Sequence, residues 1–211
     1  MLSALEPVVI TGMGVLACNG VGRRAFWDAL GSGKSGIGPV TRFDASELPC
    51  RIAGEVHDFD PKDFIKVADV KRWHRPVHLA MAAAQLAEDD SELSKAGYEP
   101  ERIAVGMGTS VGSLDESYDD YRRAYADKGW TGVDRMASSS TSGHSATAAI
   151  SARHGLRGPA ITIGSGCATG LDMLAWGRHQ IRSGRVDAAM VGATEAPVNG
   201  MTFAATCALG I

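Results

Sequence analysis

The sequence predicts a layered α/β domain with a largely buried sheet. Short apolar runs that end in glycine recur along the chain, at residues 8–12, 103–108, 161–164 and 188–192. Amphipathic patterns typical of helices separate these runs. Alternation of strands and helices favours a layered architecture, and strands without alternating polar residues favour burial on both faces.

The predicted elements follow one another along the chain in a regular order. The first strand is expected at residues 8–12, where Val8, Val9 and Ile10 are β-branched. Residues 43–66 contain Pro49, Pro61 and several acidic residues, and predict an irregular excursion with one short strand at 52–56. Helices are expected over residues 23–30, 77–96, 114–126, 142–153 and 168–182.

Composition and charge exclude several classes of protein. The 211 residues carry a formal net charge of −3, which argues against nucleic acid as the main ligand. No apolar run is long enough to span a bilayer, and Glu6 and Pro7 interrupt the apolar start that a secretory signal would need. We therefore expect a cytoplasmic protein that is not associated with a membrane, built as one domain over residues 1–211.

The cysteines also favour a reducing compartment. The four cysteines are far apart in sequence and form no C-x-x-C pair, which argues against a metal site and against a disulfide framework. They are Cys18, Cys50, Cys167 and Cys207.

Cys167 stands out because of the residues around it. The run Ile161–Ile163 predicts a short buried strand, small residues follow it, and an amphipathic helix is expected next. Cys167 would then lie where a strand leads into the N-terminus of a helix, where free backbone amides and the helix dipole favour a thiolate. From this segment alone, a nucleophile and a buried apolar filler are equally good interpretations.

Two glycine-rich segments resemble phosphate-binding motifs only weakly. Gly12–Ala17 matches G-x-G-x-x-A after a strand, but no second strand with an acidic residue follows about 20 residues later, as a dinucleotide site requires. Gly33-Lys34-Ser35 resembles part of a Walker A loop, but Asp28 occupies the position of its first glycine.

A third segment, Gly108–Gly112, is a literal G-x-S-x-G between a strand and a helical pattern, the setting of a hydrolase nucleophile. A hydrolase that uses Ser110 would need an acid and then a histidine on later strand ends. The pair Asp172 and His179 would share one helix, and no histidine follows Asp187. A tight turn into a helix is therefore the better interpretation, and a hydrolase remains a distant third possibility.

Taken together, these segments resemble β-ketoacyl-acyl-carrier-protein synthases and polyketide ketosynthases, which are condensing enzymes of the thiolase-like superfamily. The resemblance covers nearly the whole chain. It rests on an ordered set of segments: residues 8–15, 26–30, 33–37, 42–46, 52–56, 59–61, 155–159, 167–170 and 191–196.

The resemblance implies the N-terminal βαβαβ half of a thiolase-like fold, with a mixed, largely buried sheet covered by helices. In that family the second half supplies two histidines and a lysine that drive decarboxylation, and we find no such positions in these 211 residues. It also implies that the isolated chain has no condensing activity and needs the missing half.

The activity implied is that of an acyltransferase of the 3-oxoacyl-[acyl-carrier-protein] synthase type. Cys167 would accept an acyl group from acyl carrier protein, for condensation with a malonyl-carrier in fatty acid or polyketide synthesis. No metal and no cofactor would be needed, because phosphopantetheine arrives on the carrier. The alternative is a non-catalytic subunit that holds an acyl chain within a ketosynthase complex. Retention of Cys167 favours the catalytic subunit, because related chain-length factors lack this cysteine.

The resemblance also assigns residues to binding. Val111 falls where the family has an apolar gate beside the nucleophile, and Met107, Thr109 and Ala137 map near the acyl pocket. His144 stands where many of these synthases have asparagine, close to the pocket and the dimer interface.

A local basic cluster, consisting of Lys66, Lys71, Arg72 and Arg75, precedes the helix expected from Val77. Such a patch would steer an acidic carrier protein, although an ordinary solvated helix entry explains it nearly as well. The partners expected are therefore acyl carrier protein and a second ketosynthase chain. That chain would complete a homodimer, supply the other half, or resemble a chain-length factor.

Overall fold

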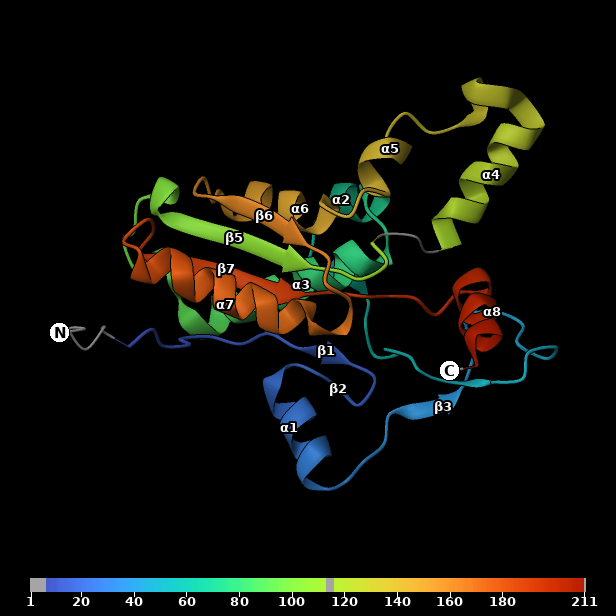
Figure 1. Ribbon diagram of the computed structural model, residues 1–211, viewed down its shortest axis with the longest axis horizontal. Coiled ribbons are helices and arrows are strands. Elements are labelled where there is room, and N and C mark those ends of the chain that lie inside the picture. Colours follow the sequence, from blue (N-terminus) through green and yellow to red (C-terminus); the bar gives the residue numbers. More distant parts are fainter. Residues whose placement is uncertain (1–6, 113–115, 211) are drawn as a thin grey trace.

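The central feature of the fold is a three-stranded parallel sheet. The computed structural model describes residues 7–112 and 116–210 (Figure 1). The strands are β5 (Ile103–Gly108), β6 (Ala160–Ile163) and β7 (Ala188–Ala193), in the order β6-β5-β7. Three of the predicted strands are thus confirmed. All six residues of β5 are buried, as expected for the middle strand.

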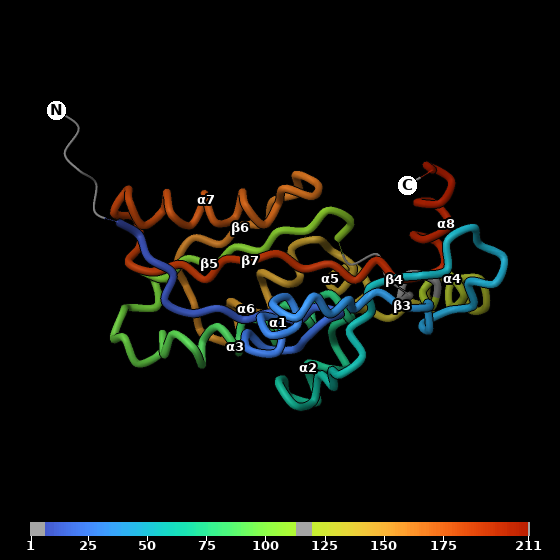
Figure 2. The backbone as a smooth tube through the Cα atoms, turned by 90° about the horizontal axis from the view of Figure 1, so that it is seen from below, coloured from blue at the N-terminus to red at the C-terminus, as the bar shows by residue number. Residues whose placement is uncertain are grey.

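Helices cover both faces of this sheet. α7 (Thr169–Arg182) lies on one face, and α3 (Arg75–Ser91) and α6 (Ser145–His154) lie on the other (Figures 1 and 2). The main core lies on the second face, where Val105 and Met107 from β5 join a cluster of buried side chains from α3 and α6. The layered α/β class is confirmed.

Glycines bring α7 close to the sheet. A Cβ on Gly106 of β5 would lie 3.0 Å from the Trp176 ring, and a Cβ on Gly177 would lie 3.0 Å from Cγ1 of Val191. These contacts are tighter than almost all real Cβ contacts, so helix and sheet approach as closely as they do because both positions lack a side chain.

The predicted strand at residues 8–12 is wrong. The described part of this segment is not paired with any strand, and Val9 and Ile10 are each 69% exposed. The segment instead runs along α3: a Cβ on Gly14 would lie 1.8 Å from the carbonyl oxygen of Ala83, and one on Gly12 would lie 2.4 Å from that of Ala87. The glycines of the G-x-G-x-x-A motif therefore permit packing against a helix backbone.

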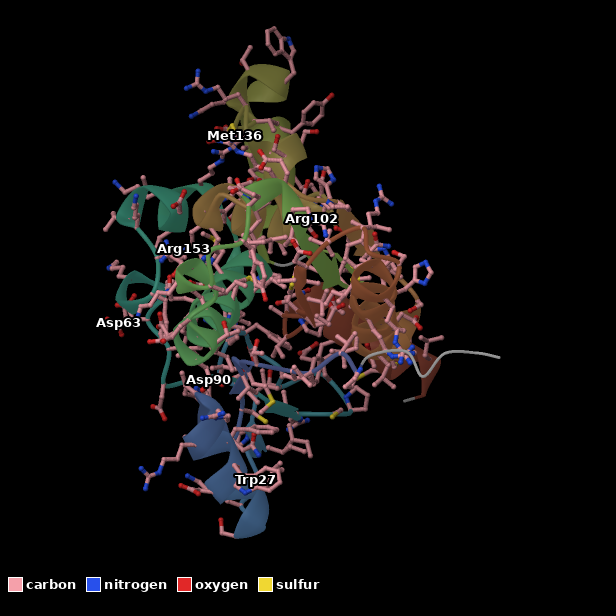
Figure 3. All side chains as sticks on the ribbon, turned by 90° about the vertical axis from the view of Figure 1, so that its left-hand side faces the viewer. Trp27, Asp63, Asp90, Arg102, Met136 and Arg153 are labelled. Atoms are coloured by element: carbon pink, nitrogen blue, oxygen red, sulfur yellow. The ribbon has the colours of Figure 1, made fainter. Side chains whose placement is uncertain are left out.

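The strands nearest that segment form a small hairpin. β1 (Leu16–Ala17) pairs antiparallel with β2 (Gly20–Val21), and α1 (Arg23–Gly31) follows. Figure 3 shows Trp27 at the outer part of α1, and its side chain is 71% exposed.

The irregular excursion expected over residues 43–66 is confirmed. It contains β4 (Ile52–Gly54), which pairs antiparallel with β3 (Ile37–Pro39), and the 3₁₀ turn η1 (Pro61–Asp63). A short helix that the sequence did not predict, α2 (Val67–Arg72), leads from it to α3.

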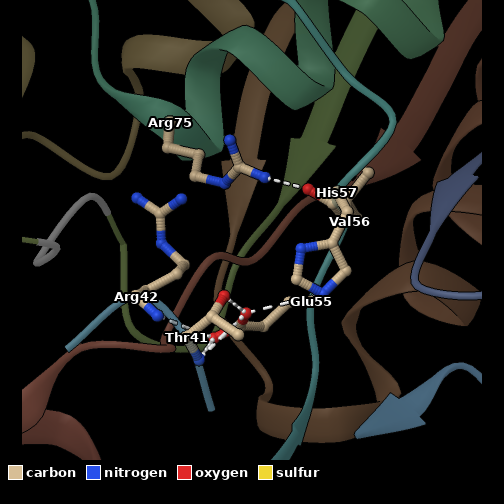
Figure 4. A network of polar contacts seen from close by, with 6 residues as sticks. All are labelled: Thr41, Arg42, Glu55, Val56, His57 and Arg75. Carbon is tan, nitrogen blue, oxygen red and sulfur yellow. Dashed lines mark hydrogen bonds and ion pairs between the residues drawn. The ribbon is translucent and has the colours of Figure 1, made fainter. Parts of the chain in front are cut away.

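A buried carboxylate organises the excursion. Glu55 is 4% exposed and accepts hydrogen bonds from the Thr41 hydroxyl at 2.5 Å, the Thr41 amide at 3.1 Å and the Arg42 amide at 3.2 Å (Figure 4). Burial raises the pKa of Glu55, but these hydrogen bonds and the nearby His57 outweigh it, so the pKa lies below its usual value. Glu55 therefore stays ionised while it ties the loop together.

The long helix predicted over 77–96 is shorter than expected. α3 ends at Ser91, because Glu92 adopts a left-handed conformation with φ 52°, and two 3₁₀ turns, η2 (Leu93–Lys95) and η3 (Pro100–Arg102), lead into β5.

The chain between β5 and β6 makes a long detour. α4 (Glu116–Lys128) and the turn η4 (Gly129–Gly132) project away from the sheet, and α5 (Ala137–Ser140) returns toward it (Figure 1). The first residues of the helix predicted over 114–126 lie outside the described ranges.

After β7 the chain forms α8 (Gly200–Leu209), which the sequence did not predict. Its ten residues are almost all apolar or small and show no polar face that would mark a period. The Asn199 side chain caps it by accepting from the Thr202 amide at 3.0 Å.

Candidate active site

Three loops meet at one edge of the parallel sheet. They follow the carboxyl ends of β5, β6 and β7, which all point the same way (Figure 1). Direct hydrogen bonds join them: the Thr109 amide donates to the Ile163 carbonyl at 3.1 Å, and the Thr194 amide donates to the Gly108 carbonyl at 3.0 Å. Ligands of open α/β sheets bind at this edge.

Cys167 lies on the loop after β6. The loop turns at Gly166, with φ 70°, and passes through a single 3₁₀ turn, η5 (Gly166–Ala168), before α7 begins at Thr169. The predicted position between a strand and a helix N-terminus is therefore confirmed, and the Cys167 side chain is exposed. Cys167 thus lies next to the positive end of the α7 dipole.

Two side chains of α7 hold the loop that carries Cys167. The hydroxyl of the buried Thr169 accepts from the Ser165 amide at 3.1 Å and donates to the Gly166 carbonyl at 2.5 Å. The Ser165 hydroxyl donates to the carboxylate of Asp172, one turn along the helix. Neither role was predicted from the sequence, although a threonine two residues after the cysteine is a recognisable local signal.

The turn after β5 is held by a residue of the loop after β7. One carboxylate oxygen of Glu195 accepts from the Thr109 hydroxyl at 2.9 Å, from the Ser110 amide and from the Val111 amide at 3.3 Å. The backbone of Ser110 is thus part of a carboxylate-bound turn. The Asp172 considered for a hydrolase accepts from Ser165, and both Asp172 and His179 lie on α7, as the sequence predicted.

The residues assigned to an acyl pocket fall into two groups. Thr109, Val111 and His144 lie near one another along the loops: a Cβ on Gly143 would lie 3.7 Å from Cγ2 of Thr109. Val111 is 39% exposed and His144 is exposed.

The other two residues assigned to the acyl pocket, Ala137 and Met107, are less exposed than Val111 and His144. Ala137 begins α5 and is half-buried, whereas Met107 is 6% exposed and packs into the main core. The Met107 sulfur faces Gly192, where a Cβ would lie 3.4 Å from it.

A polar network not anticipated from sequence anchors the detour between β5 and β6. The His74 ring contacts the Tyr121 hydroxyl at 2.9 Å and the Ser140 hydroxyl at 3.1 Å, and these two hydroxyls lie 3.0 Å apart. Ser140 is fully buried. No sequence pattern signals this contact, because its members are separated by 47 and 66 residues from His74.

The basic cluster is divided by the fold. Lys66, Lys71 and Arg72 are exposed around α2, whereas Arg75 is half-buried and donates to the Val56 carbonyl at 2.5 Å (Figure 4). Burial and the neighbouring Arg42 lower the pKa of Arg75 below its usual value.

A groove of about 610 Å³ lies beside the exposed members of the cluster. Its lining includes Lys66, Arg72, Trp73, Met81, Ala149 and Arg153. Lys66 and Arg72 therefore present their charges both to solvent and to this groove.

Within residues 7–112 and 116–210 there is no group of three or more histidine, cysteine or acidic side chains arranged to hold a metal ion. The four cysteines are free thiols. In the part of the chain that the structure describes, no helix has the length and apolar character needed to cross a bilayer.

Comparison with known proteins decides the family. The family model described as the β-ketoacyl synthase N-terminal domain matches residues 5–211. The chain belongs to the β-ketoacyl synthase family. The resemblance inferred from sequence is thereby confirmed, and the chain spans about half the length of the curated relatives it matches.

Two relatives show the range of the synthase family around this chain. The ketoacyl synthase α subunit of the tetracenomycin polyketide synthase from Streptomyces glaucescens is 36% identical over 209 residues, covering 95% of this chain and 48% of that protein. A 3-oxoacyl-[acyl-carrier-protein] synthase 2 from Synechocystis sp. is 32% identical over 199 residues, covering 94% of this chain and 48% of that protein.

Solved structures agree with the fold. The ishigamide ketosynthase/chain length factor superposes with a TM-score of 0.87 at 28% identity, covering 96% of this chain and 50% of that chain. A second match is one chain of the structure of a type II polyketide synthase acyl-carrier protein in complex with its ketosynthase. The TM-score is 0.80 at 26% identity, and the match covers 96% of this chain and 48% of that chain. The thiolase-like fold class is therefore confirmed.

Proposed function

We propose that this chain carries the acyl-accepting site of a 3-oxoacyl-[acyl-carrier-protein] synthase. The observation that supports this most directly is the exposed Cys167 on the loop after β6, within the 3₁₀ turn that leads into the N-terminus of α7. In the first step the Cys167 thiolate attacks the carbonyl carbon of an acyl-carrier thioester. A new thioester forms at Cys167, and the carrier leaves as a thiolate that takes up a proton.

The backbone amide of Cys167 is a candidate donor to the oxyanion that develops in this step. Thr169 and Asp172 support that geometry, because their hydrogen bonds to Ser165 and Gly166 fix the backbone immediately before the cysteine. We therefore propose that Thr169 and Asp172 orient Cys167.

In the second step a malonyl-carrier loses carbon dioxide and its carbanion attacks the acyl-cysteine. A carbon–carbon bond forms, the 3-ketoacyl product stays on the carrier, and Cys167 leaves as a thiolate. The resemblance to the family assigns this decarboxylation to two histidines and a lysine of the other half. We therefore propose that condensation needs that half, in the same polypeptide or in a partner.

The surface of the described chain supports such a partner. Leu171 is 72% exposed and Leu174 is 45% exposed on the outer side of α7, and Val9 and Ile10 are also exposed. We propose that these apolar side chains contact the other half or a partner.

We propose acyl carrier protein and a second ketosynthase chain, either an identical copy or a chain-length-factor-like subunit, as the partners. One structural neighbour is a ketosynthase/chain length factor and another is a ketosynthase in complex with an acyl-carrier protein. The exposed cations Lys66, Lys71 and Arg72 would steer an acidic carrier. The reducing cytoplasm suits this chemistry, since a free thiol must persist at Cys167.

The test is acylation of the purified chain by an acyl-carrier thioester, with the adduct mapped by peptide mass spectrometry. We expect the acyl group on Cys167, and none on that peptide in a Cys167→Ala variant. Acylation confined to Cys18, Cys50 or Cys207 would reject the proposal.

A further inference from the structure

The carboxylate of Glu195 connects two loops that are far apart in sequence. A single oxygen, Oε1, accepts from the Thr109 hydroxyl at 2.9 Å, from the Ser110 amide and from the Val111 amide at 3.3 Å. The other oxygen, Oε2, is buried and has no hydrogen-bond partner within the described residues. Hydrogen bonds to a carboxylate are stronger than neutral ones, so the contact fixes the turn after β5.

The rest of the turn depends on the same group. The Thr109 hydroxyl, which donates to Glu195, also accepts from the Gly112 amide at 2.9 Å. Gly112 closes the turn with φ 71°. Val111 lies inside this closed turn and remains 39% exposed. The position of the Val111 side chain therefore follows from the contact between Thr109 and Glu195.

The turn touches the nucleophile loop directly. The Thr109 amide donates to the Ile163 carbonyl at 3.1 Å, and a Cβ on Gly164 would lie 3.1 Å from the Thr109 carbonyl oxygen. Gly164 precedes Cys167 by three residues. A displacement of the turn would therefore change the space next to the thiol, where an acyl chain would lie.

We propose that Glu195 is a positioning residue that sets, through the Thr109–Val111 turn, the length of acyl chain that Cys167 accepts. This inference rests on the proposed function. Glu195 holds backbone and hydroxyl donors and does not take part in bond making. Its removal would release three donors at once and let Val111 move, so Cys167 would discriminate less between short and long chains.

The experiment compares methyl and dodecyl methanethiosulfonate as probes of chain length. The thiolate attacks the sulfenyl sulfur of either reagent, a disulfide forms and methanesulfinate leaves. Rates are measured at Cys167 by peptide mass spectrometry, with the exposed Cys50 as an internal reference in the same sample. The variants are Glu195→Ala, Glu195→Gln, Thr109→Val and Glu101→Ala. The last is a matched control, because Glu101 is an exposed carboxylate 3.6 Å from Arg157.

We expect Glu195→Ala to move the dodecyl-to-methyl rate ratio at Cys167 about ten-fold toward the ratio at Cys50. Glu195→Gln keeps an acceptor oxygen for the three donors and should stay within about two-fold of the unmodified chain. Thr109→Val removes one donor and should shift the ratio in the same direction by less. Glu101→Ala should leave it unchanged.

Equal loss of both rates in Glu195→Ala and Thr109→Val would overturn the inference, since Glu195 would then only support the fold. An unchanged ratio would overturn it too. If Glu195→Ala fails to fold, the other two variants decide. A partial shift of the ratio in Thr109→Val, with Glu195→Gln close to the unmodified chain, supports the inference, and an unchanged ratio in Thr109→Val overturns it. Failure of the proposed function gives a different result: no acylation of Cys167 by an acyl-carrier thioester, whatever the thiosulfonate ratios show.

Discussion

Gly108 packs so closely against Thr169 that a side chain at position 108 would collide with it. A Cβ on Gly108, the last residue of β5, would lie 2.0 Å from Cγ2 of Thr169, the first residue of α7. The same threonine holds the Ser165 amide and the Gly166 carbonyl. The end of the middle strand thus supports the turn that carries Cys167.

We expect Gly108→Ala to displace Thr169, lower the free energy of unfolding by about 1–3 kcal/mol, and slow acylation of Cys167. Urea unfolding and the acylation rate would measure the two effects. Gly31→Ala is the control, because nothing lies within 4 Å of a Cβ at Gly31, so it should neither lower the free energy of unfolding nor slow acylation. If Gly108→Ala is destabilised but Cys167 is acylated at the normal rate, the contact between Gly108 and Thr169 stabilises the fold without supporting the site.

Thr169 offers a test of the hydroxyl alone. Thr169→Val keeps the shape but leaves the Ser165 amide and the Gly166 carbonyl without this partner, at a cost of about 1–3 kcal/mol in stability. Thr169→Ser keeps the hydroxyl and should retain most of the acylation rate. If the two variants acylate equally fast, the hydroxyl does not position the nucleophile.

The proposed gate predicts a chain-length effect. Val111→Trp should reduce acylation of Cys167 by long-chain thioesters more than by short-chain ones in the reconstituted synthase, because the larger side chain fills space beside the thiol. Rates with acetyl and dodecanoyl carriers would measure it. A uniform loss at both lengths would point to general damage at the turn.

Charge reversal tests the basic cluster. Lys71→Glu with Arg72→Glu should weaken carrier binding at low salt, and the difference from the unmodified protein should shrink as ionic strength rises. Isothermal titration at two salt concentrations would show this. Arg24→Glu, compared with each single reversal at Lys71 and Arg72, is the control, because Arg24 is exposed on α1. Unchanged affinity at low salt would exclude the cluster as the docking surface.

Glu55 predicts a pH dependence of stability. Its pKa in the folded chain lies below the ordinary 4.5, so the unfolded chain binds this proton first as pH falls. The stabilisation is present above pH 4.5 and is lost as pH falls through the folded pKa. Glu55→Gln should therefore be less stable than the parent at pH 7, and the two thermal midpoints should converge in acid. A constant difference across this range would argue against an ionised Glu55.

The strands β5, β6 and β7 were predictable because each is a short apolar run ended by glycine, a pattern contained within the segment. The position of Cys167 followed from the same local pattern. Residues 8–12 carry an equally good strand pattern, yet a strand also needs a neighbouring edge, and sequence does not state whether one is present.

Long-range polar contacts were out of reach for a different reason. Glu195 meets Thr109 across 86 residues, and His74 meets Ser140 across 66. A single glutamate or histidine has no periodicity that marks its partner, so these contacts appear only once the topology is known. The acyl-pocket residues came from the family resemblance, and among them Met107 lies in the core because its side chain faces α3 and α6.

The strand order β6-β5-β7 has a consequence for synthesis on the ribosome. β5 ends at Gly108, but its parallel neighbours begin only at Ala160 and Ala188. At translation rates of about 5–20 residues per second, β5 waits roughly 3–10 s before its first partner has been made. During that interval α3, which precedes β5 in the chain and packs against Val105 and Met107, is available to shield an apolar strand with two open edges.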